Sequence, residues 1–273
     1  VGKGLARLYE LQHSDGGWGW WEDDATHPYM TAYVIMGLKE AQKNGYSVSA
    51  YSLNQGIAAL KKMVSQKVMP VKTLGGSIQQ GEEWNTRIYL LYALTKAGVV
   101  NKAKIEEVFN NRKDMNDYGL ALLAMCLHSA GDKAKTSQVM SELDKKASVD
   151  DKECFWEGRT FTYSWVDNKI ETTAFCLMAY IQISPDDPKI SKTIQWLSRM
   201  RQGPSYTSTK DTAAVVYAFT EYLMKSGEME PDYFLSVKLN DGKVLETPVK
   251  TAVLQKDQAA LLFDMKKVKS GPN

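Results

Sequence analysis

The chain has 273 residues, of which 44% are hydrophobic and 24% are charged, as in an ordinary globular protein with a sizeable core. Its 34 lysines and arginines nearly balance its 32 aspartates and glutamates, so charge gives no reason to expect a nucleic-acid partner. No apolar run approaches the roughly 20 residues of a membrane span, and we expect no direct membrane contact. The start at Val1 lacks the features of a signal peptide, and we expect any signal to lie upstream in a longer chain.

A turn rich in glycine and tryptophan separates the first two helical patterns. Helical spacing over residues 4–12 gives way to Asp-Gly-Gly at 15–17, and three tryptophans follow within residues 18–21. Glycine supplies the positive φ angles of a tight turn, and a tryptophan ring favours burial while its N–H still needs a partner. We expect this turn to lock one helix pair onto the next, with an N-cap for the next helix within residues 23–26 and Pro28 in its first turn.

Two kinds of helix alternate along the rest of the helical region. Inner helices, which are apolar almost all round, are predicted at 27–44, 84–94, 118–127, 171–180 and 208–219. Outer, amphipathic helices are predicted at 49–66, 132–147 and 188–200, and a short polar helix at 101–112. Residues 68–81 are predicted to form a loop, and residues 155–165 a short hairpin or an irregular loop.

The pattern changes near the C-terminus. From Tyr233 apolar and polar residues alternate with a period of two, Asp241-Gly242 is a hairpin turn, and residues 244–249 form the return strand. The sequence therefore predicts a helical domain over 1–230 and a β segment over 231–273 that belongs to a following β domain.

The inner helices form a weak internal repeat, and each is followed by an outer helix. Stacked pairs of this kind bury one helix layer inside another. Because the inner helices are apolar on nearly all faces, a closed α/α toroid fits better than an open solenoid, which would leave one inner side wet. The anchor positions of the repeat are Thr31, Thr86, Tyr118, Thr173 and Thr212.

The sequence contains no P-loop, GxGxxG, HExxH or GxSxG motif. Its histidines and cysteines are too scattered to form a zinc site by local spacing, and Cys126 and Cys176 fall in apolar helices as buried thiols. We therefore predict no catalytic residue, no metal and no cofactor. The histidines are His13, His27 and His128, and the remaining cysteine is Cys154.

Two enzyme classes that share the α/α toroid are the alternatives. The acidic residues 22–24 are similar to the Asp-x-Asp-Asp motif of class II terpene cyclases, but Trp21 stands at the first position of that motif. Protein prenyltransferases need a zinc site of Asp, Cys and His, and no spacing here supports one. Either enzyme would show a deep central cavity with convergent acids or a metal.

Three stretches in the same order resemble the thioester domain of bacterial α2-macroglobulins, and the resemblance covers roughly residues 2–227. A β domain follows the thioester domain in that family, as the segment from Tyr233 suggests here. The stretches are Leu11–Trp21 with Tyr29–Val34, Glu171–Ala174 with Ile194–Leu197, and Tyr206–Ala213.

The resemblance implies protease trapping: a protease cuts a bait region elsewhere in a very large protein, and that protein then rearranges and encloses the protease. It implies proteases as partners of the parent protein, neighbouring β domains of the same chain as contacts, and a periplasmic, cell-envelope or secreted location. Many members bind the protease covalently through a thioester in a Cys-x-Glu-Gln motif. This chain contains no such motif, and we expect its place to lie before Val1. Because residues 68–83 contain no histidine, we expect any upstream thioester to prefer amines.

A thioester must be shielded from water until a protease cleaves the bait region, and aromatic side chains can exclude water from a dry pocket. We predict such an aromatic shield or contact surface among five residues. The alternative is that these rings only plug the end of the toroid, or that the whole toroid is a pure scaffold or binding module of a large surface protein. The five residues are Trp18, Trp20, Trp21, Tyr29 and Trp84.

Overall fold

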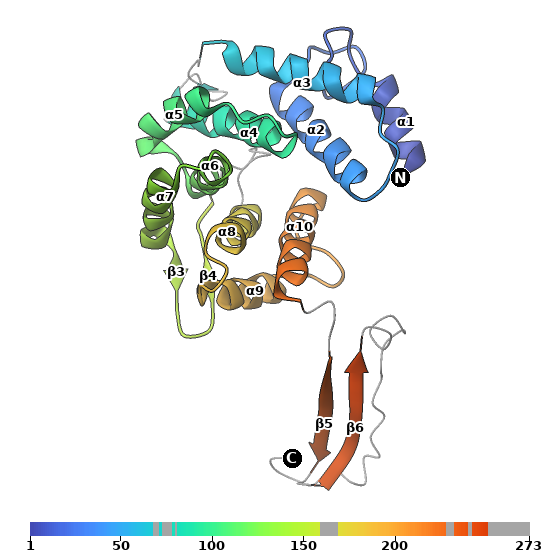
Figure 1. Cartoon of the computed structure of the whole chain (residues 1–273), viewed down its shortest axis with the longest axis vertical. Coiled ribbons are helices and arrows are strands. Elements are labelled where there is room, and N and C mark those ends of the chain that lie inside the picture. The colour runs from blue at the N-terminus through green and yellow to red at the C-terminus, as the bar shows by residue number, and fades with distance from the viewer. Residues whose placement is uncertain are drawn as a thin grey trace. The chain divides into compact units, whose positions relative to one another are not determined.

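A computed structural model describes residues 1–67, 71–72, 78–79, 81–158, 169–227, 232–239 and 242–250 (Figure 1). The chain divides into two compact units, Val1–Ala218 and Phe219–Asn273. The first is helical, and the α/α toroid that the sequence predicts is confirmed. No helix in the described ranges combines the length and the apolar character that crossing a bilayer requires.

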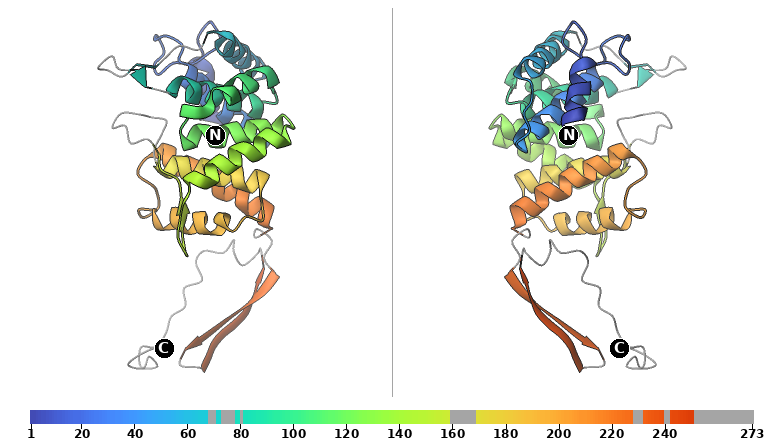
Figure 2. Two further views of the ribbon diagram at one scale, coloured as in Figure 1. Left: turned by 90° about the vertical axis from the view of Figure 1, so that its left-hand side faces the viewer. Right: turned by 90° about the vertical axis from the view of Figure 1, so that its right-hand side faces the viewer.

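Inner and outer helices alternate as predicted, and the two layers can be followed in Figures 1 and 2. The inner helices are α2 (Pro28–Lys43), α4 (Glu82–Lys96), α6 (Asp117–Ser129), α8 (Lys169–Ile183) and α10 (Thr209–Ser226). The outer helices are α1 (Gly2–Glu10), α3 (Ala50–Ser65), α5 (Lys102–Asn110), α7 (Lys133–Lys146) and α9 (Lys189–Arg199), and η1 (Arg112–Asp114) is a short 3-10 turn.

Two inner helices, α4 and α6, end at a glycine. Gly98 and Gly131 adopt positive φ angles of 87° and 79°, which cost a residue without Cβ little. Beyond each glycine the next N–H closes the helix: Val99 donates to the Leu94 carbonyl at 2.8 Å, and Asp132 donates to Leu127 at 3.1 Å. These closures turn the chain sharply from an inner helix into the outer helix that follows.

One short strand pair lies in the predicted loop 68–81, and another lies at the start of the predicted range 155–165. In the first, β1 (Val71–Lys72) pairs antiparallel with β2 (Ile78–Gln79), and in the second β3 (Ser148–Val149) pairs with β4 (Cys154–Phe155). The second pair begins before the predicted range of 155–165, most of which lies outside the described residues.

The second unit contains the predicted hairpin. Strand β5 (Asp232–Leu239) pairs antiparallel with β6 (Gly242–Lys250), from Asp232 opposite Lys250 to Leu239 opposite Gly242. Asp241 of the predicted turn lies outside the described residues. The alternating pattern is therefore confirmed as a pair of strands.

All three cysteines are buried and none forms a disulfide bond, and this burial confirms the prediction for Cys126 and Cys176. Burial raises the pKa of Cys126 to about 12, so this thiol stays protonated at neutral pH.

Candidate contact site at the tryptophan turn

The tryptophan turn, residues 11–27, runs from the end of α1 to the start of α2 and is fastened to α3. Gly16 has φ of 89°, and a Cβ on it would meet the Gln55 carbonyl oxygen at 2.7 Å. The side-chain amide of Gln12 donates to the Gly16 carbonyl and to the Ser52 carbonyl of α3, both at 2.8 Å. The turn therefore fits closely against α3, because its backbone carries no side chain at the point of contact.

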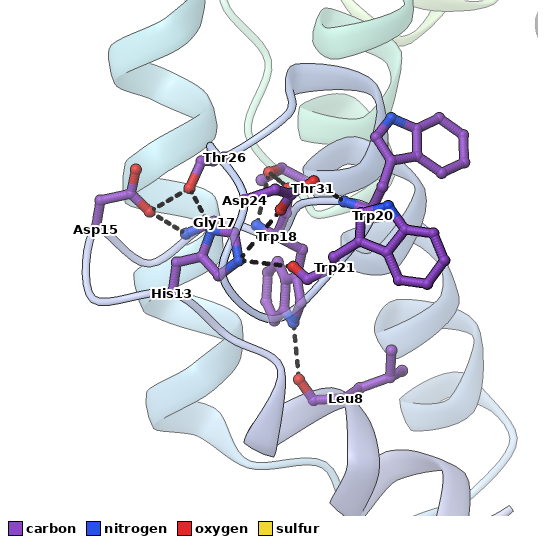
Figure 3. A network of polar contacts seen from close by, with 10 residues as sticks. All are labelled: Leu8, His13, Asp15, Gly17, Trp18, Trp20, Trp21, Asp24, Thr26 and Thr31. Carbon is purple, nitrogen blue, oxygen red and sulfur yellow. Dashed lines mark hydrogen bonds and ion pairs between the residues drawn. The ribbon is translucent and has the colours of Figure 1, made fainter.

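Trp18 joins three parts of the fold (Figure 3). Its ring is 2% exposed, and its indole N–H donates to the Leu8 carbonyl of α1 at 2.7 Å. Its backbone N–H donates to the Thr31 hydroxyl at 3.0 Å, and that hydroxyl donates to the Trp18 carbonyl at 3.2 Å. Every polar group of Trp18 is thus satisfied inside the core, which confirms that the turn locks α1 onto α2.

Two related clasps occur elsewhere in the part of the chain that the structure describes. The Trp156 backbone N–H donates to Thr173 of α8 at 3.1 Å, and its indole N–H donates to the Leu143 carbonyl of α7 at 2.9 Å. The Tyr206 N–H donates to the Thr212 hydroxyl at 3.1 Å, and its own hydroxyl donates to the Leu197 carbonyl of α9 at 3.0 Å. Each clasp joins an outer helix to the next inner helix.

The sequence interpretation missed Trp156 and Tyr206 as members of this set. The signal was present in the repeat, because the three threonines of the clasps are anchor positions of the sequence repeat. An aromatic residue lies before each of these anchors, at a variable distance.

The polar side of the turn contains His13, Asp15, Asp24 and Thr26 (Figure 3). Asp24 accepts a hydrogen bond from the Trp20 backbone N–H at 2.8 Å, and the Thr26 hydroxyl donates to Asp15 at 2.8 Å. The prediction of an N-cap within residues 23–26 is therefore wrong: α2 has His27 at its N-cap and no side-chain cap, because these oxygens hold the turn instead.

The five predicted shield residues do not gather at one place. Trp20 and Trp21 point outward from the turn with 41% and 78% of their surface exposed, whereas Trp18 is buried beside them (Figure 3). Tyr29 is buried and stacks on Tyr89 of α4, with ring centroids 4.6 Å apart. Trp84 lies half-buried in the first turn of α4.

Aromatic rings from four inner helices pack against one another. This aromatic hub consists of Tyr29, Tyr89, Tyr118 and Phe175, which come from α2, α4, α6 and α8 and are each at most 9% exposed. The Tyr118 and Phe175 rings meet edge to face, with centroids 4.9 Å apart. Burial, and then the charge of Glu171, raises the pKa of Tyr29 and Tyr118.

Glu171 lies beside the aromatic hub at the start of α8. Its carboxylate pairs at 2.5 Å with the Lys210 ammonium of α10, and the two side chains are 4% and 17% exposed. A buried carboxylate needs such a partner, because desolvation penalises an isolated charge heavily. This pair ties α10 to the centre of the toroid.

Two hollows lie beside the outer helices. One of about 490 Å³ is lined by residues such as Lys102 and Leu127, and one of about 390 Å³ by residues such as Arg112 and Glu142. Within the described ranges, no group of three or more His, Cys, Asp or Glu side chains lies close enough together to hold a metal ion.

Comparisons with known proteins agree with this architecture. Residues 89–222 match the family model for the A-macroglobulin TED domain. Over these residues the chain belongs with the TED, or thioester, domains of the α-macroglobulin family. The α2-macroglobulin of Thermotoga maritima is 44% identical to this chain over 62 residues, which are 23% of this chain and 4% of that protein. The α2-macroglobulin of Escherichia coli is 24% identical over 218 residues, 79% of this chain and 13% of that protein.

Solved structures show the same fold. Native E. coli α2-macroglobulin, from domain MG7 to its C-terminus, has a TM-score of 0.69 at 17% identity and matches 91% of this chain and 37% of its own. The trypsin-activated E. coli protein has a TM-score of 0.64 at 16% identity, over 91% of this chain and 16% of its own. The TED domain described here thus spans a small part of the proteins that it resembles.

Proposed function

We propose that this chain is a non-catalytic module of a bacterial α2-macroglobulin-like protein that traps proteases. The observation that carries the proposal is the aromatic hub, because packed rings occupy the place where a toroid enzyme would hold its substrate. Of the acidic residues 22–24, Glu22 pairs with Arg7 of α1 at 3.5 Å and Asp24 holds the Trp20 backbone. Because these two carboxylates bind groups of α1 and of the turn, they do not support the cyclase alternative.

Within the parent protein, proteases are the proposed targets and neighbouring β domains the proposed contacts. Of the structures with this fold, one is a trypsin-activated and another an elastase-activated α2-macroglobulin, which supports proteases as the partners. We place the toroid at 1–230, the start of a following β domain at 231–273, and the parent protein in the periplasm, the cell envelope or the medium. Any thioester would come from residues before Val1 and would prefer amines.

Trp20 and Trp21 are the proposed contact surface of the module. Exposed tryptophans concentrate at contact surfaces, where a large, rigid ring gains much buried area at little entropic cost. The turn beneath them is anchored by Trp18, so the two rings are presented on a firm base. We infer that they dock against a neighbouring domain of the parent chain and exclude water there.

The test uses the full-length parent protein with Trp20→Ser and Trp21→Ser together. Trapped protease keeps its activity on a small peptide and loses it on a large protein substrate, so the ratio of the two rates measures trapping. We expect the double variant to trap several-fold less protease while it stays folded by circular dichroism. The matched control is Tyr46→Ser, which removes a ring that is 47% exposed at the other end of α2. Equal loss in the control, or no loss in the double variant, contradicts the contact surface.

A further inference from the structure

His13 lies between groups that all accept hydrogen bonds. Because the Thr26 hydroxyl donates its hydrogen to Asp15, the Thr26 oxygen faces His13 Nδ1 as an acceptor at 2.8 Å. On the other side of the ring, Nε2 lies 3.3 Å from the Trp21 carbonyl oxygen and 3.7 Å from Asp24 Oδ1. A neutral imidazole has a single N–H, so one nitrogen would turn its lone pair toward an acceptor.

Asp24 supplies an independent observation. Its Oδ2 accepts the Trp20 N–H, whereas its Oδ1 is buried and makes no hydrogen bond to any residue that the structure describes. It packs directly on Gly19, where a Cβ would stand 1.7 Å from Oδ1. A buried carboxylate oxygen without a hydrogen bond is costly, and His13 is the group placed to neutralise it.

We propose that His13 is a proton-dependent latch that holds the exposed tryptophans in place. The doubly protonated ring donates to Thr26 and to the Trp21 carbonyl, and its charge neutralises Asp24, which in turn holds the Trp20 backbone. When the proton leaves, Thr26 or the Trp21 carbonyl loses its donor, and the buried Oδ1 of Asp24 no longer has the charge of His13 beside it. The segment from Trp20 to Asp24 then loosens.

Other titratable and charged groups lie around His13 and Asp24. Asp15 lies beyond Thr26, and the charges of His13 and of Lys62 of α3 both act on it. Glu22 is occupied by Arg7 of α1. At the start of α2, His27 lies near Asp24, and burial lowers the pKa of His27. His13 thus stands between two carboxylates, and histidine changes charge between about pH 5 and pH 8.

The latch would make the tryptophan surface depend on pH, and this consequence rests on the contact surface proposed above. Mildly acidic conditions would hold Trp20 and Trp21 in their outward arrangement. Loss of the proton would leave the two rings attached to a looser segment, with Trp18 still clasped in the core.

Nuclear magnetic resonance of the ¹⁵N-labelled 273-residue chain tests the latch without any partner. The ring nitrogens of His13 report its protonation, and the backbone N–H of Trp20 reports the bond to Asp24. Over about pH 5 to 8 we expect the Trp20 amide signal to shift together with the His13 ring. In His13→Gln and in Asp24→Asn this shift should fall several-fold. The matched control is His128→Gln, an exposed histidine at the end of α6, which should behave as the wild type.

Two outcomes overturn the latch. One is an unchanged titration of the Trp20 amide in His13→Gln together with its loss in His27→Gln, because His27 would then be the responsible group; its ring lies 5.8 Å from that of Trp20. The other is a Trp20 amide that does not respond to pH in the wild type. Failure of the protease-trapping test with an intact titration would instead contradict only the docking role of the tryptophans.

Discussion

Replacing Thr173 by valine tests the aromatic–threonine clasp, because the two side chains have nearly the same shape. Thr173 and Trp156 are both fully buried, and the threonine hydroxyl serves the backbone N–H and the carbonyl of Trp156 at 3.1 and 3.2 Å. Without the hydroxyl a buried donor loses its partner, which costs about 1–3 kcal/mol. For a unit of this size the loss corresponds to a fall in Tm of about 2–4 °C per kcal/mol.

The assay is urea unfolding followed by circular dichroism, with Thr136→Val as the matched control. Thr136 is also buried, at 3% exposure, but its hydroxyl only adds a second bond to the Asp132 carbonyl, which already accepts the Thr136 N–H. Loss of the Thr136 hydroxyl should lower the free energy of unfolding by less than about 1 kcal/mol. Equal destabilisation by the two variants would refute the reasoning, because the clasp would then be worth no more than an ordinary helical side-chain bond.

Three further predictions concern the hub and the turn. Lys210→Met should lower the free energy of unfolding by about 3–5 kcal/mol in urea, since it leaves Glu171 charged and buried, and adding Glu171→Gln should recover part of the loss. Hydrogen bonds from the Gly17 N–H and from the Thr26 hydroxyl lower the pKa of Asp15 below its ordinary 3.8. Asp15 therefore stabilises the turn above pH 3.8, and this contribution is lost as the pH falls through the lowered pKa. Asp15→Asn should flatten the acid side of the curve of stability against pH. Gly19→Ala should disturb the turn and lower Tm, because its Cβ would overlap Asp24, whereas Gly37→Ala, with nothing within 4 Å, should raise stability by about 0.5–1 kcal/mol.

The helices and their order could be read from the sequence because their signals are local. Apolar residues recur at helical spacing within each segment, so α2, α6 and α8 lie within a few residues of their predicted ranges, and a glycine follows α2 and α6. The N-cap of α2 could not be predicted in this way. Asp24 and Thr26 have the composition of caps, but they bind a turn whose path depends on α1 and α3.

Part of the candidate site could likewise be read from the sequence, and part depended on the packing. The sequence identified the tryptophan turn, and the repeat identified the threonines that Trp18 and its two counterparts bind. Which tryptophans are buried followed from the packing alone, since Trp18, Trp20 and Trp21 are chemically identical and nearly adjacent, yet range from 2% to 78% exposed.

The amino-acid sequence by itself thus determined the alternation of helix pairs, the toroid and the family, because each rests on short-range patterns kept in order along the chain. Only the tertiary structure decided the aromatic hub, the pairing of Glu171 with Lys210 and the position of His13 beside Asp24. The physical reason is that burial and the pairing of polar groups depend on which surfaces meet in space. Residues that meet in the hub come from four different helices, and nothing in the local sequence of one helix specifies its neighbours.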